Sequence, residues 1–185
     1  MAIYHLTVKV LSRSNGAKAV GSAAYRSGEE LKDERYDTVH DYSRRSGGVV
    51  HSEIMAPEDA PDWASDRETL WNTVEASEKR KDSQVAREIE VALPRELSED
   101  ENRELVRRFV GDELVSRGMI ADVAIHQRDS SDGFTNPHAH ILLTMRPVTA
   151  EGFGPKVSGR RIGRGMTPRS LRPGASGVAR TATKR

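Results

Sequence analysis

Three histidine residues close together in the sequence could bind a divalent metal ion. His138 and His140 are separated by one small residue within an apolar run, and a β-strand would place both imidazoles on the same face. His126 ends an alternating run that predicts a neighbouring strand, and antiparallel pairing would bring its imidazole to that face. Three neutral imidazoles with an open coordination position are typical of a catalytic metal site. Ordinary core or surface histidines are the alternative interpretation.

Two other kinds of side chain could complete such a site. Glu88 and Glu90 alternate with apolar residues over 85–94, so both carboxylates would lie on the polar face of a strand. A carboxylate there could accept the second ring N–H of a metal-bound histidine and fix its tautomer. Tyr25, near the end of a short predicted helix, could be a nucleophile, but a tyrosine phenol has a pKa near ~10 and needs a metal or cationic neighbour. A solvated carboxylate and a packing tyrosine are the alternatives.

Further side chains could contact a nucleic acid. Basic residues around Tyr25 could contact phosphates, and aromatic residues on predicted loops could stack on bases. The basic residues are Arg13, Lys18, Arg26, Arg44 and Arg45, and the aromatic ones are Tyr36, Tyr42 and Phe134. A solvated surface explains the basic residues equally well.

Composition limits the class of protein. The 185 residues are enough for one well-buried domain. The absence of cysteine excludes disulfide frameworks, cysteine-zinc modules and thiol catalysis, and it fits a cytoplasmic location. No apolar run approaches the ~20 residues of a membrane span, and the start does not resemble a signal peptide.

Charge divides the chain into two parts. Residues 156–185 contain nine Lys or Arg and no Asp or Glu, so the overall charge of +1 leaves residues 1–155 with −8. A basic segment rich in Gly, Pro and Ser cannot bury enough apolar surface to order itself, so 156–185 is predicted to be a disordered tail that could contact phosphates.

The order of predicted elements indicates the fold class. Strands are expected over 3–10, 48–55 and 85–94 and at the histidines, a helix over 17–26, and a loop or flap over 29–48. Two Ser-x-x-Glu capping boxes, at Ser65–Glu68 and Ser98–Glu101, mark the starts of two amphipathic helices. This order predicts an α+β domain with a mainly antiparallel sheet of about five strands and helices packed on one face.

Five segments in order resemble a known family. They are the start of the chain over 1–14, the Ala-Ala-Tyr-Arg-Ser segment 23–27, the strand segment 87–97, the Ala-Ile-His segment 124–126, and Asn-Pro-His-Ala-His-Ile-Leu-Leu over 136–143. Together they resemble the relaxase domain of MobA/MobL-type (MobQ) plasmid mobilisation proteins, particularly the TraA conjugative relaxases of Ti-type plasmids. The likeness covers residues 1 to 155.

This resemblance implies an HUH endonuclease, a DNA relaxase that starts conjugative transfer. Tyr25 would attack a phosphodiester at the origin of transfer and form a 5′-phosphotyrosine bond, which the released 3′ hydroxyl can reverse. His126, His138 and His140 would hold the metal, and Glu88 would support one of them, with Glu90 a lesser candidate. The family uses Mg²⁺ or Mn²⁺. Imidazoles alone would suggest zinc or nickel, and Mn²⁺ is the compromise.

The same resemblance implies partners and exposes a departure. Single-stranded plasmid DNA, accessory relaxosome proteins and a type IV secretion coupling protein are the expected partners. After residue 155 the chain lacks the charged, Trp-containing helices expected of relaxases, which suggests a frame shift or truncation and an incomplete domain. Two other functions therefore stay open, a metal-dependent phosphohydrolase and a DNA-binding remnant that recognises a transfer origin without cutting it.

Overall fold

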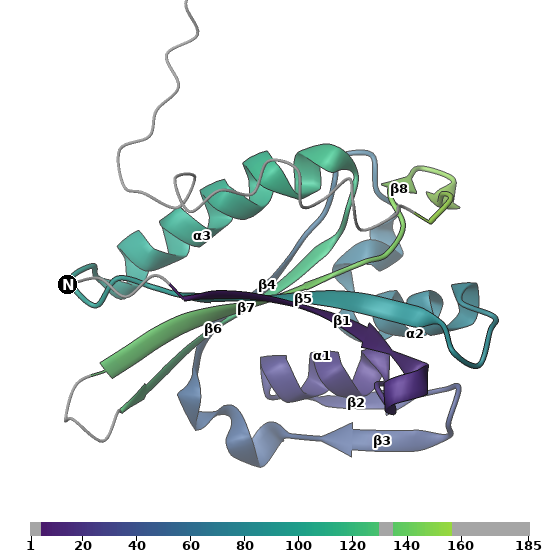
Figure 1. Cartoon of the computed structure of the whole chain (residues 1–185), viewed down its shortest axis with the longest axis horizontal. Coiled ribbons are helices and arrows are strands. Elements are labelled where there is room, and N and C mark those ends of the chain that lie inside the picture. The colour runs from purple at the N-terminus through teal and green to yellow at the C-terminus, as the bar shows by residue number, and fades with distance from the viewer. Residues whose placement is uncertain (1–4, 130–134, 157–185) are drawn as a thin grey trace, which may run out of the picture.

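The computed structural model describes residues 5–129 and 135–156, which form a five-stranded sheet, two small hairpins and three α-helices (Figure 1). The helices are α1 (Ala19–Ser27), α2 (Arg67–Ser77) and α3 (Glu99–Glu113). The large sheet contains β1 (Leu6–Ser12), β4 (Val49–Met55), β5 (Gln84–Ala92), β6 (Ala121–Asp129) and β7 (Thr135–Leu143). The hairpins pair β2 (Glu30–Asp33) with β3 (Thr38–Asp41) and β8 (Val148–Thr149) with β9 (Gly152–Phe153). Short 3₁₀ helices are η1 (Arg13–Asn15), η2 (Ser43–Gly48), η3 (Asp62–Ser65) and η4 (Val115–Arg117).

The sheet places the histidine-bearing strands side by side near its centre. Its strand order is β1-β5-β7-β6-β4, and every neighbouring pair is antiparallel. His138 on β7 lies directly opposite His126 on β6, and His140 lies opposite Ala124 on β6 and Glu90 on β5. Residues opposite one another share a face, so all three imidazoles leave the same side of the sheet. The predicted α+β class, with a mainly antiparallel sheet of five strands, is confirmed.

The face opposite the histidines is covered by α3. Alternate residues of β5, β6 and β7 supply its apolar layer, and the stripe predicted for α3 packs on it. The main members are Ile89, Val91, Val123, Ile125, Ile141 and Leu143 from the sheet and Val106, Phe109 and Val110 from α3, each no more than 3% exposed. Burial of each such side chain stabilises the folded protein by about 1.5–3 kcal/mol. A shift of the strand register by one residue would expose these side chains, so their burial also fixes the face on which the histidines lie.

The other face is partly covered by α1 and α2, so the prediction that the helices pack on one face is wrong. Small residues of α1 and the apolar stripe of α2 pack against Ala86 of β5 and Leu142 of β7, which lie on the histidine face. In Figure 1 α3 lies above the sheet and α1 below it. An apolar stripe predicts that a helix packs on the sheet, but it does not predict the face, because the segment that connects two strands could pass over either face.

A buried ion pair fastens α2 to the histidine face. Arg67 donates to both carboxylate oxygens of Asp122 on β6 at 2.9–3.1 Å, and Trp71 Nε1 donates to the same carboxylate at 2.8 Å. Burial raises the pKa of Asp122, although the hydrogen bonds from Arg67 act in the opposite direction. Asp122 lies four residues before His126 on the same strand, so this contact helps to hold β6 in place.

The first strand, predicted over 3–10, lies at an edge of the sheet, and its apolar side chains are largely exposed. Leu6, Val8 and Val10 share the face that α3 covers elsewhere, yet they are 37%, 52% and 43% exposed. β1 pairs only with β5 in the described part of the chain, and α3 packs over the more central strands. The alternation therefore identified the strand correctly but not its position in the sheet.

The segment predicted as a loop over 29–48 contains the β2–β3 hairpin and η2. Its strands are short and rich in charged residues, so they carry no apolar alternation that predicts a strand. The hairpin packs beside α1, where the ring of His40 approaches Gly21 so closely that a Cβ at that glycine would lie 3.0 Å from it. The hairpin thereby supports the helix that carries Tyr25.

Helix starts follow the capping pattern with one shift. Ser98 begins α3 with both hydrogen bonds of the capping box, its hydroxyl accepting from Glu101 N and its backbone N–H donating to the Glu101 carboxylate. At α2 the cap is Asp66 and not Ser65, because the Asp66 carboxylate accepts from Thr69 N at 2.8 Å. Among the described residues, no helix has the length and apolar character needed to cross a membrane.

Candidate metal centre and nucleophile

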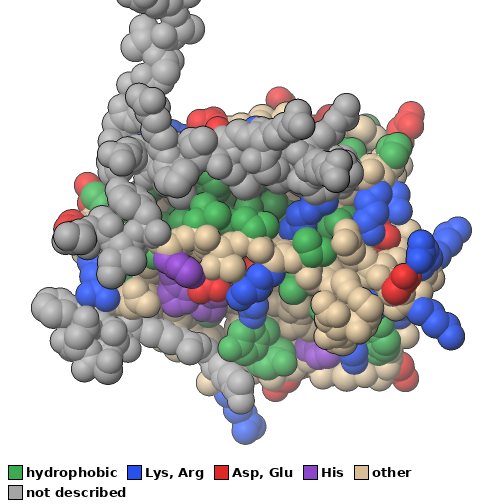
Figure 2. Space-filling view, in the orientation of Figure 1, with side chains coloured by type: hydrophobic (Ala, Val, Ile, Leu, Met, Phe, Trp, Pro, Cys, Tyr) green, Lys and Arg blue, Asp and Glu red, His purple; other side chains and the backbone are tan. Residues whose placement is uncertain are grey.

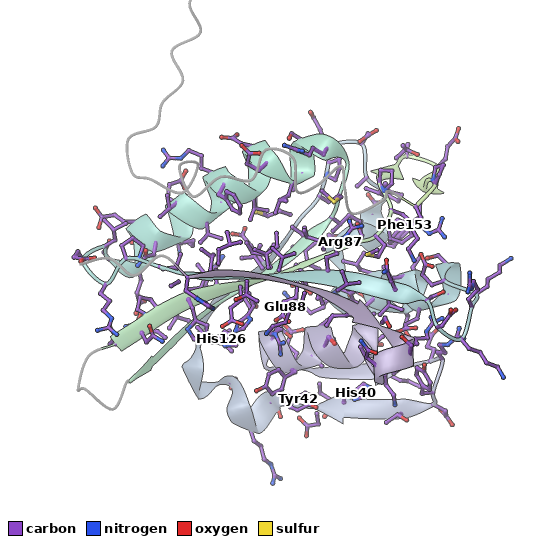
Figure 3. The ribbon with its side chains drawn as sticks, in the orientation of Figure 1. His40, Tyr42, Arg87, Glu88, His126 and Phe153 are labelled. Carbon is purple, nitrogen blue, oxygen red and sulfur yellow. The ribbon has the colours of Figure 1, made fainter. Side chains whose placement is uncertain are left out.

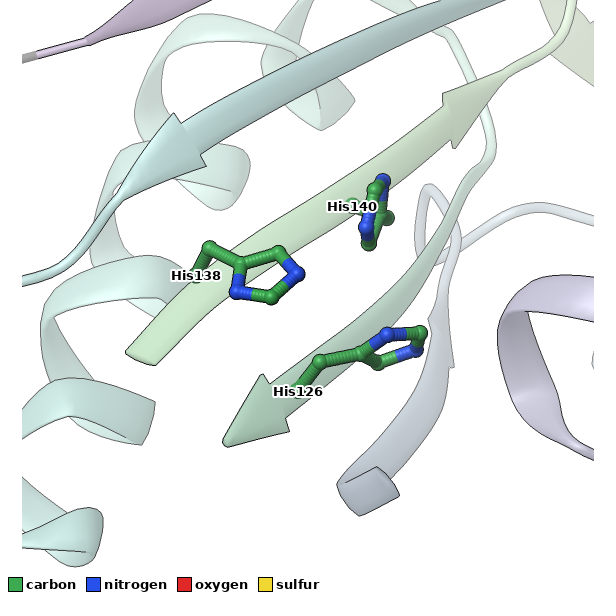
Figure 4. Close-up of side chains that lie close together, drawn as sticks. All are labelled: His126, His138 and His140. Atoms are coloured by element: carbon green, nitrogen blue, oxygen red, sulfur yellow. The ribbon is translucent and has the colours of Figure 1, made fainter. Parts of the chain in front are cut away.

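The three histidines form a compact cluster on the sheet (Figure 4). His138 and His140 project from β7 and His126 projects from β6, and one ring nitrogen of each lies within 4.8 Å of the others. The ring centroids are 4.8–5.5 Å apart. His126 is 5% exposed and the other two are partly exposed, so the cluster has a buried side and an open side. Figure 2 shows histidine side chains at the surface beside acidic and basic ones. The predicted convergence of the three imidazoles is present in the structure.

One ring nitrogen of each histidine lies beside an oxygen acceptor. His126 Nε2 lies 2.7 Å from the Arg26 carbonyl oxygen, and His138 Nδ1 lies 2.9 Å from the Asn136 carbonyl oxygen. His140 Nδ1 lies 3.0 Å from Glu88 Oε1. Carbonyl oxygens and an ionised carboxylate only accept hydrogen bonds. The neutral tautomer that makes all three contacts has its lone pairs on Nδ1 of His126 and on Nε2 of His138 and His140.

This donor set fits a divalent transition metal. Neutral imidazoles are common ligands of such ions, and each one here donates its second N–H to an oxygen, as metal-bound histidines usually do. Three protein ligands leave coordination positions for water or a substrate oxygen. The cluster can therefore hold a metal, whose identity the three imidazoles do not define.

Glu88 is the carboxylate that contacts the cluster. Its side chain is 2% exposed, and Oε1 accepts from His140 Nδ1 and also from Arg26 Nε at 2.5 Å. Burial alone would raise the pKa of Glu88, but the hydrogen bonds from His140 and Arg26 outweigh it and lower the pKa to about 2. Figure 3 shows Glu88 and His126 on the side of the sheet where α1 lies. Glu88 is therefore ionised at neutral pH.

Glu90 has a different environment. It is the direct cross-strand partner of His140, yet its carboxylate pairs with Lys9 at 3.6 Å, and its side chain is 32% exposed. The sequence placed both glutamates on one face without distinguishing them. The structure brings Glu88, and not Glu90, into hydrogen-bond contact with the cluster.

Tyr25 lies in the last turn of α1, next to this network. Its side chain is 42% exposed. Its ring is nearly perpendicular to the ring of Tyr42, with centroids 5.2 Å apart, and the guanidinium of Arg26 lies 4.8 Å from its ring centre. Because Arg26 also contacts Glu88 and, through its carbonyl, His126, one residue connects Tyr25 to the histidine cluster. The helix ends at Gly28, whose φ of +70° suits glycine.

The other residues considered for nucleic-acid contacts are distributed unevenly. Arg13 is buried in an ion pair with Glu75, so it cannot contact a phosphate as the sequence suggested. This burial arises because η1 lies against α2, a contact that local sequence does not reveal. Lys18 lies over the Tyr36 ring, Arg44 is exposed, and the Arg45 side chain and Phe134 lie outside the described residues. Local sequence grouped Arg26 with the basic surface residues, but its contact with Glu88 is visible only in three dimensions.

The remaining histidines lie apart from the cluster. His5, His40 and His51 contact Thr7, Asp33 and Glu53, respectively. None of the three belongs to a metal-binding group among the described residues.

Comparisons with known proteins agree with this combination of fold and site. The model of the MobA/MobL family matches residues 17–179. The chain is 42% identical over 166 residues to conjugal transfer protein TraA of Agrobacterium fabrum, covering 84% of this chain and 14% of that protein. It is 41% identical over 173 residues to mobilization protein MobL of Acidithiobacillus ferridurans, covering 82% of this chain and 45% of that protein. A solved structure described as the molecular basis of vancomycin resistance transfer in Staphylococcus aureus matches with a TM-score of 0.76 and 40% identity, covering 85% of this chain and 78% of that one.

A five-stranded antiparallel sheet with a cluster of three histidines defines a relaxase-type domain. The chain belongs to the MobA/MobL family of conjugation and mobilisation relaxases. It spans well under half the length of the TraA protein and just under half that of the MobL protein, 14% and 45% respectively.

Proposed function

We propose that this domain nicks one strand of plasmid DNA at an origin of transfer, with Tyr25 as the nucleophile. The observation that carries the proposal is the connection of Tyr25 to the histidine cluster through Arg26 and Glu88. A tyrosine packed only for structure would not need to be partly exposed beside such a cluster. The family of the chain, conjugation and mobilisation relaxases, supports the same chemistry.

The proposed reaction exchanges one phosphoester for another. The Tyr25 hydroxyl loses its proton to solvent, and its oxygen attacks the phosphorus of the scissile phosphodiester. The bond from phosphorus to the 3′ oxygen breaks, and that oxygen takes up a proton and leaves as a 3′ hydroxyl. The 5′ phosphate stays on Tyr25, so the 3′ hydroxyl can later attack it and restore the strand.

The surrounding residues hold the participants in place. The Tyr42 ring and the Arg26 guanidinium fix two sides of the Tyr25 ring, and Glu88 orients the His140 imidazole. When bound by His126, His138 and His140, a divalent ion supplies Lewis-acid stabilisation of the charge on the phosphate oxygens. Mn²⁺ or Mg²⁺ is the proposed ion, with Mn²⁺ the better match to imidazole ligands among the two.

The partners follow from this activity. Single-stranded DNA of a transfer origin is the proposed substrate, and accessory relaxosome proteins and a type IV secretion coupling protein are the proposed protein partners. Residues 1–155 are the proposed relaxase domain. A disordered basic tail is predicted over 156–185, and all of these residues except Lys156 lie outside the part of the chain that the structure describes.

A labelled single-stranded oligonucleotide that carries a transfer origin tests the proposal against the two other functions. With Mn²⁺, we expect the protein and Tyr36→Phe to form a denaturant-resistant adduct and Tyr25→Phe to form none. Tyr36 is a matched control because it is similarly exposed, 39% against 42%, and also lies beside a cationic side chain. Cleavage that persists in Tyr25→Phe would indicate a phosphohydrolase, and binding without cleavage by the unmodified protein would indicate a DNA-binding remnant.

A further inference from the structure

Arg26 makes three separate contacts around the site. Its guanidinium lies 4.8 Å from the centre of the Tyr25 ring, its Nε donates to Glu88 Oε1 at 2.5 Å, and its carbonyl oxygen accepts from His126 Nε2 at 2.7 Å. The side chain is 21% exposed, so these contacts are largely shielded from water. Two of the contacts lead to the histidine cluster and one leads to Tyr25.

We propose that Arg26 is a positioning residue that sets the location of Tyr25 relative to the histidine cluster. This inference rests on the proposed nicking function. The guanidinium is planar and has several N–H donors, so it can donate to Glu88 while its charge lies over the tyrosine ring. The Arg26 side chain acts on His140 through Glu88, whereas its contact with His126 is made by the backbone carbonyl, which every side-chain substitution keeps.

The chemistry of arginine predicts different results for two substitutions. Arg26→Gln removes the charge that faces the buried Glu88 carboxylate and the cation over the Tyr25 ring. Arg26→Lys keeps a cation that can pair with Glu88, but an ammonium has no planar fork and cannot also cover the ring. We therefore expect Lys to preserve the histidine cluster while leaving Tyr25 poorly placed.

A matched control separates positioning from general stability. Arg146 donates to Glu78 at 2.9 Å, and their side chains are 26% and 5% exposed, compared with 21% and 2% for Arg26 and Glu88. Arg146 lies beyond the end of β7, near β8 and β9, and contacts none of the histidines. Arg146→Gln removes an ion pair of similar burial, and Lys156 still pairs with Glu78 at 2.9 Å. The substitution should lower stability without affecting the cluster.

The test measures Mn²⁺ affinity by calorimetry without DNA and the rate of adduct formation at saturating Mn²⁺. We expect Arg26→Gln to weaken Mn²⁺ binding about 10-fold, within the range for residues that orient metal ligands, and to slow adduct formation at least about 10-fold. Arg26→Lys should bind Mn²⁺ within about threefold of the unmodified protein yet form adduct as slowly as the Gln variant. Arg146→Gln should match the unmodified protein in both measurements.

Several outcomes would overturn the proposal. Unchanged Mn²⁺ affinity in folded Arg26→Gln would do so, as would normal adduct formation by Arg26→Lys. If Arg26→Gln does not fold, the Lys variant still decides, because only a positioning role separates its metal affinity from its reaction rate. If the unmodified protein forms no adduct, the nicking function fails. In that case the metal affinity of Arg26→Gln still tests whether Arg26 positions the cluster.

Discussion

Glu88 on β5 contacts His140 diagonally on the neighbouring strand β7, with Oε1 3.0 Å from Nδ1, although Glu90 is the residue directly opposite His140. Arg26 approaches Glu88 from α1, whereas Lys9 on the edge strand draws Glu90 outward. The cationic partner of each glutamate, Arg26 for Glu88 and Lys9 for Glu90, therefore decides which carboxylate contacts His140, and cross-strand register alone does not.

Glu88→Gln should weaken metal binding more than Glu90→Gln. The amide cannot carry the charge that strengthens the hydrogen bond with His140, so we expect a 10- to 100-fold loss of Mn²⁺ affinity, roughly the range for such supporting partners. Glu90→Gln is the control, since its carboxylate is partly exposed and pairs with Lys9. Calorimetric titration of both variants provides the measurement, and equal losses would contradict the role of Glu88.

The stability of the metal-free protein should depend on pH through Glu88. Its pKa in the folded protein, about 2, lies below the ordinary value of 4.5. Its stabilising contribution is therefore complete above pH 4.5 and is lost as the pH falls toward 2. The difference corresponds to about 3 kcal/mol in the free energy of unfolding.

Urea unfolding between pH 6 and pH 3 tests this dependence. Glu88→Gln should lose less stability over that range than the unmodified protein, because it has no carboxylate to protonate at this position. Asp122, whose pKa burial raises, is present in both proteins and does not affect the comparison. If the free energy of unfolding of the two proteins changed in the same way with pH, Glu88 would not have the lowered pKa that its contacts with His140 and Arg26 imply.

The end of α1 should tolerate no side chain at Gly28. Its φ is +70°, and a Cβ there would lie 2.9 Å from Ser46 Cα in η2. Gly16 is a matched control, because its φ is +76° and a Cβ there would have no atom within 4 Å. We expect Gly16→Ala to cost about 1–2 kcal/mol for the left-handed backbone, and Gly28→Ala to cost at least about 1 kcal/mol more.

Thermal or urea unfolding of the two alanine variants measures that difference. Gly28→Ala should also slow adduct formation, because displacement of η2 moves the end of the helix that carries Tyr25. Equal costs for the two substitutions would show that the approach of η2 to Gly28 does not constrain the helix end.

The histidine cluster could be predicted because it depends on local alternation. The one-residue spacing of His138 and His140 places both on one face of any strand, and an antiparallel neighbour supplies His126. The capping box at Ser98 was predictable for the same reason, since its contacts span three residues. The roles proposed for Tyr25 and Glu88 rested on the family resemblance, because local sequence does not separate them from a packing tyrosine and a solvated carboxylate.

The parts that could not be predicted depend on packing between distant segments. Periodicity identifies the stripes of α1, α2 and α3 but not the face of the sheet that each covers. The charged β2–β3 hairpin has no apolar pattern, because it lies on α1 and not within the main sheet. The contact of Arg26 with Glu88 joins residues 62 positions apart, so no local signal separates Arg26 from the basic residues around it.

Mass spectrometry of the adduct tests the central claim most directly. The unmodified protein is incubated with Mn²⁺ and a transfer-origin oligonucleotide, and the product is digested with nuclease and trypsin. We predict a nucleotide 5′ phosphate on the peptide 19–26, in which Tyr25 is the only tyrosine. A nucleotide on the peptide 36–44, which contains Tyr36 and Tyr42, or a cleaved strand with no protein attached, would contradict it.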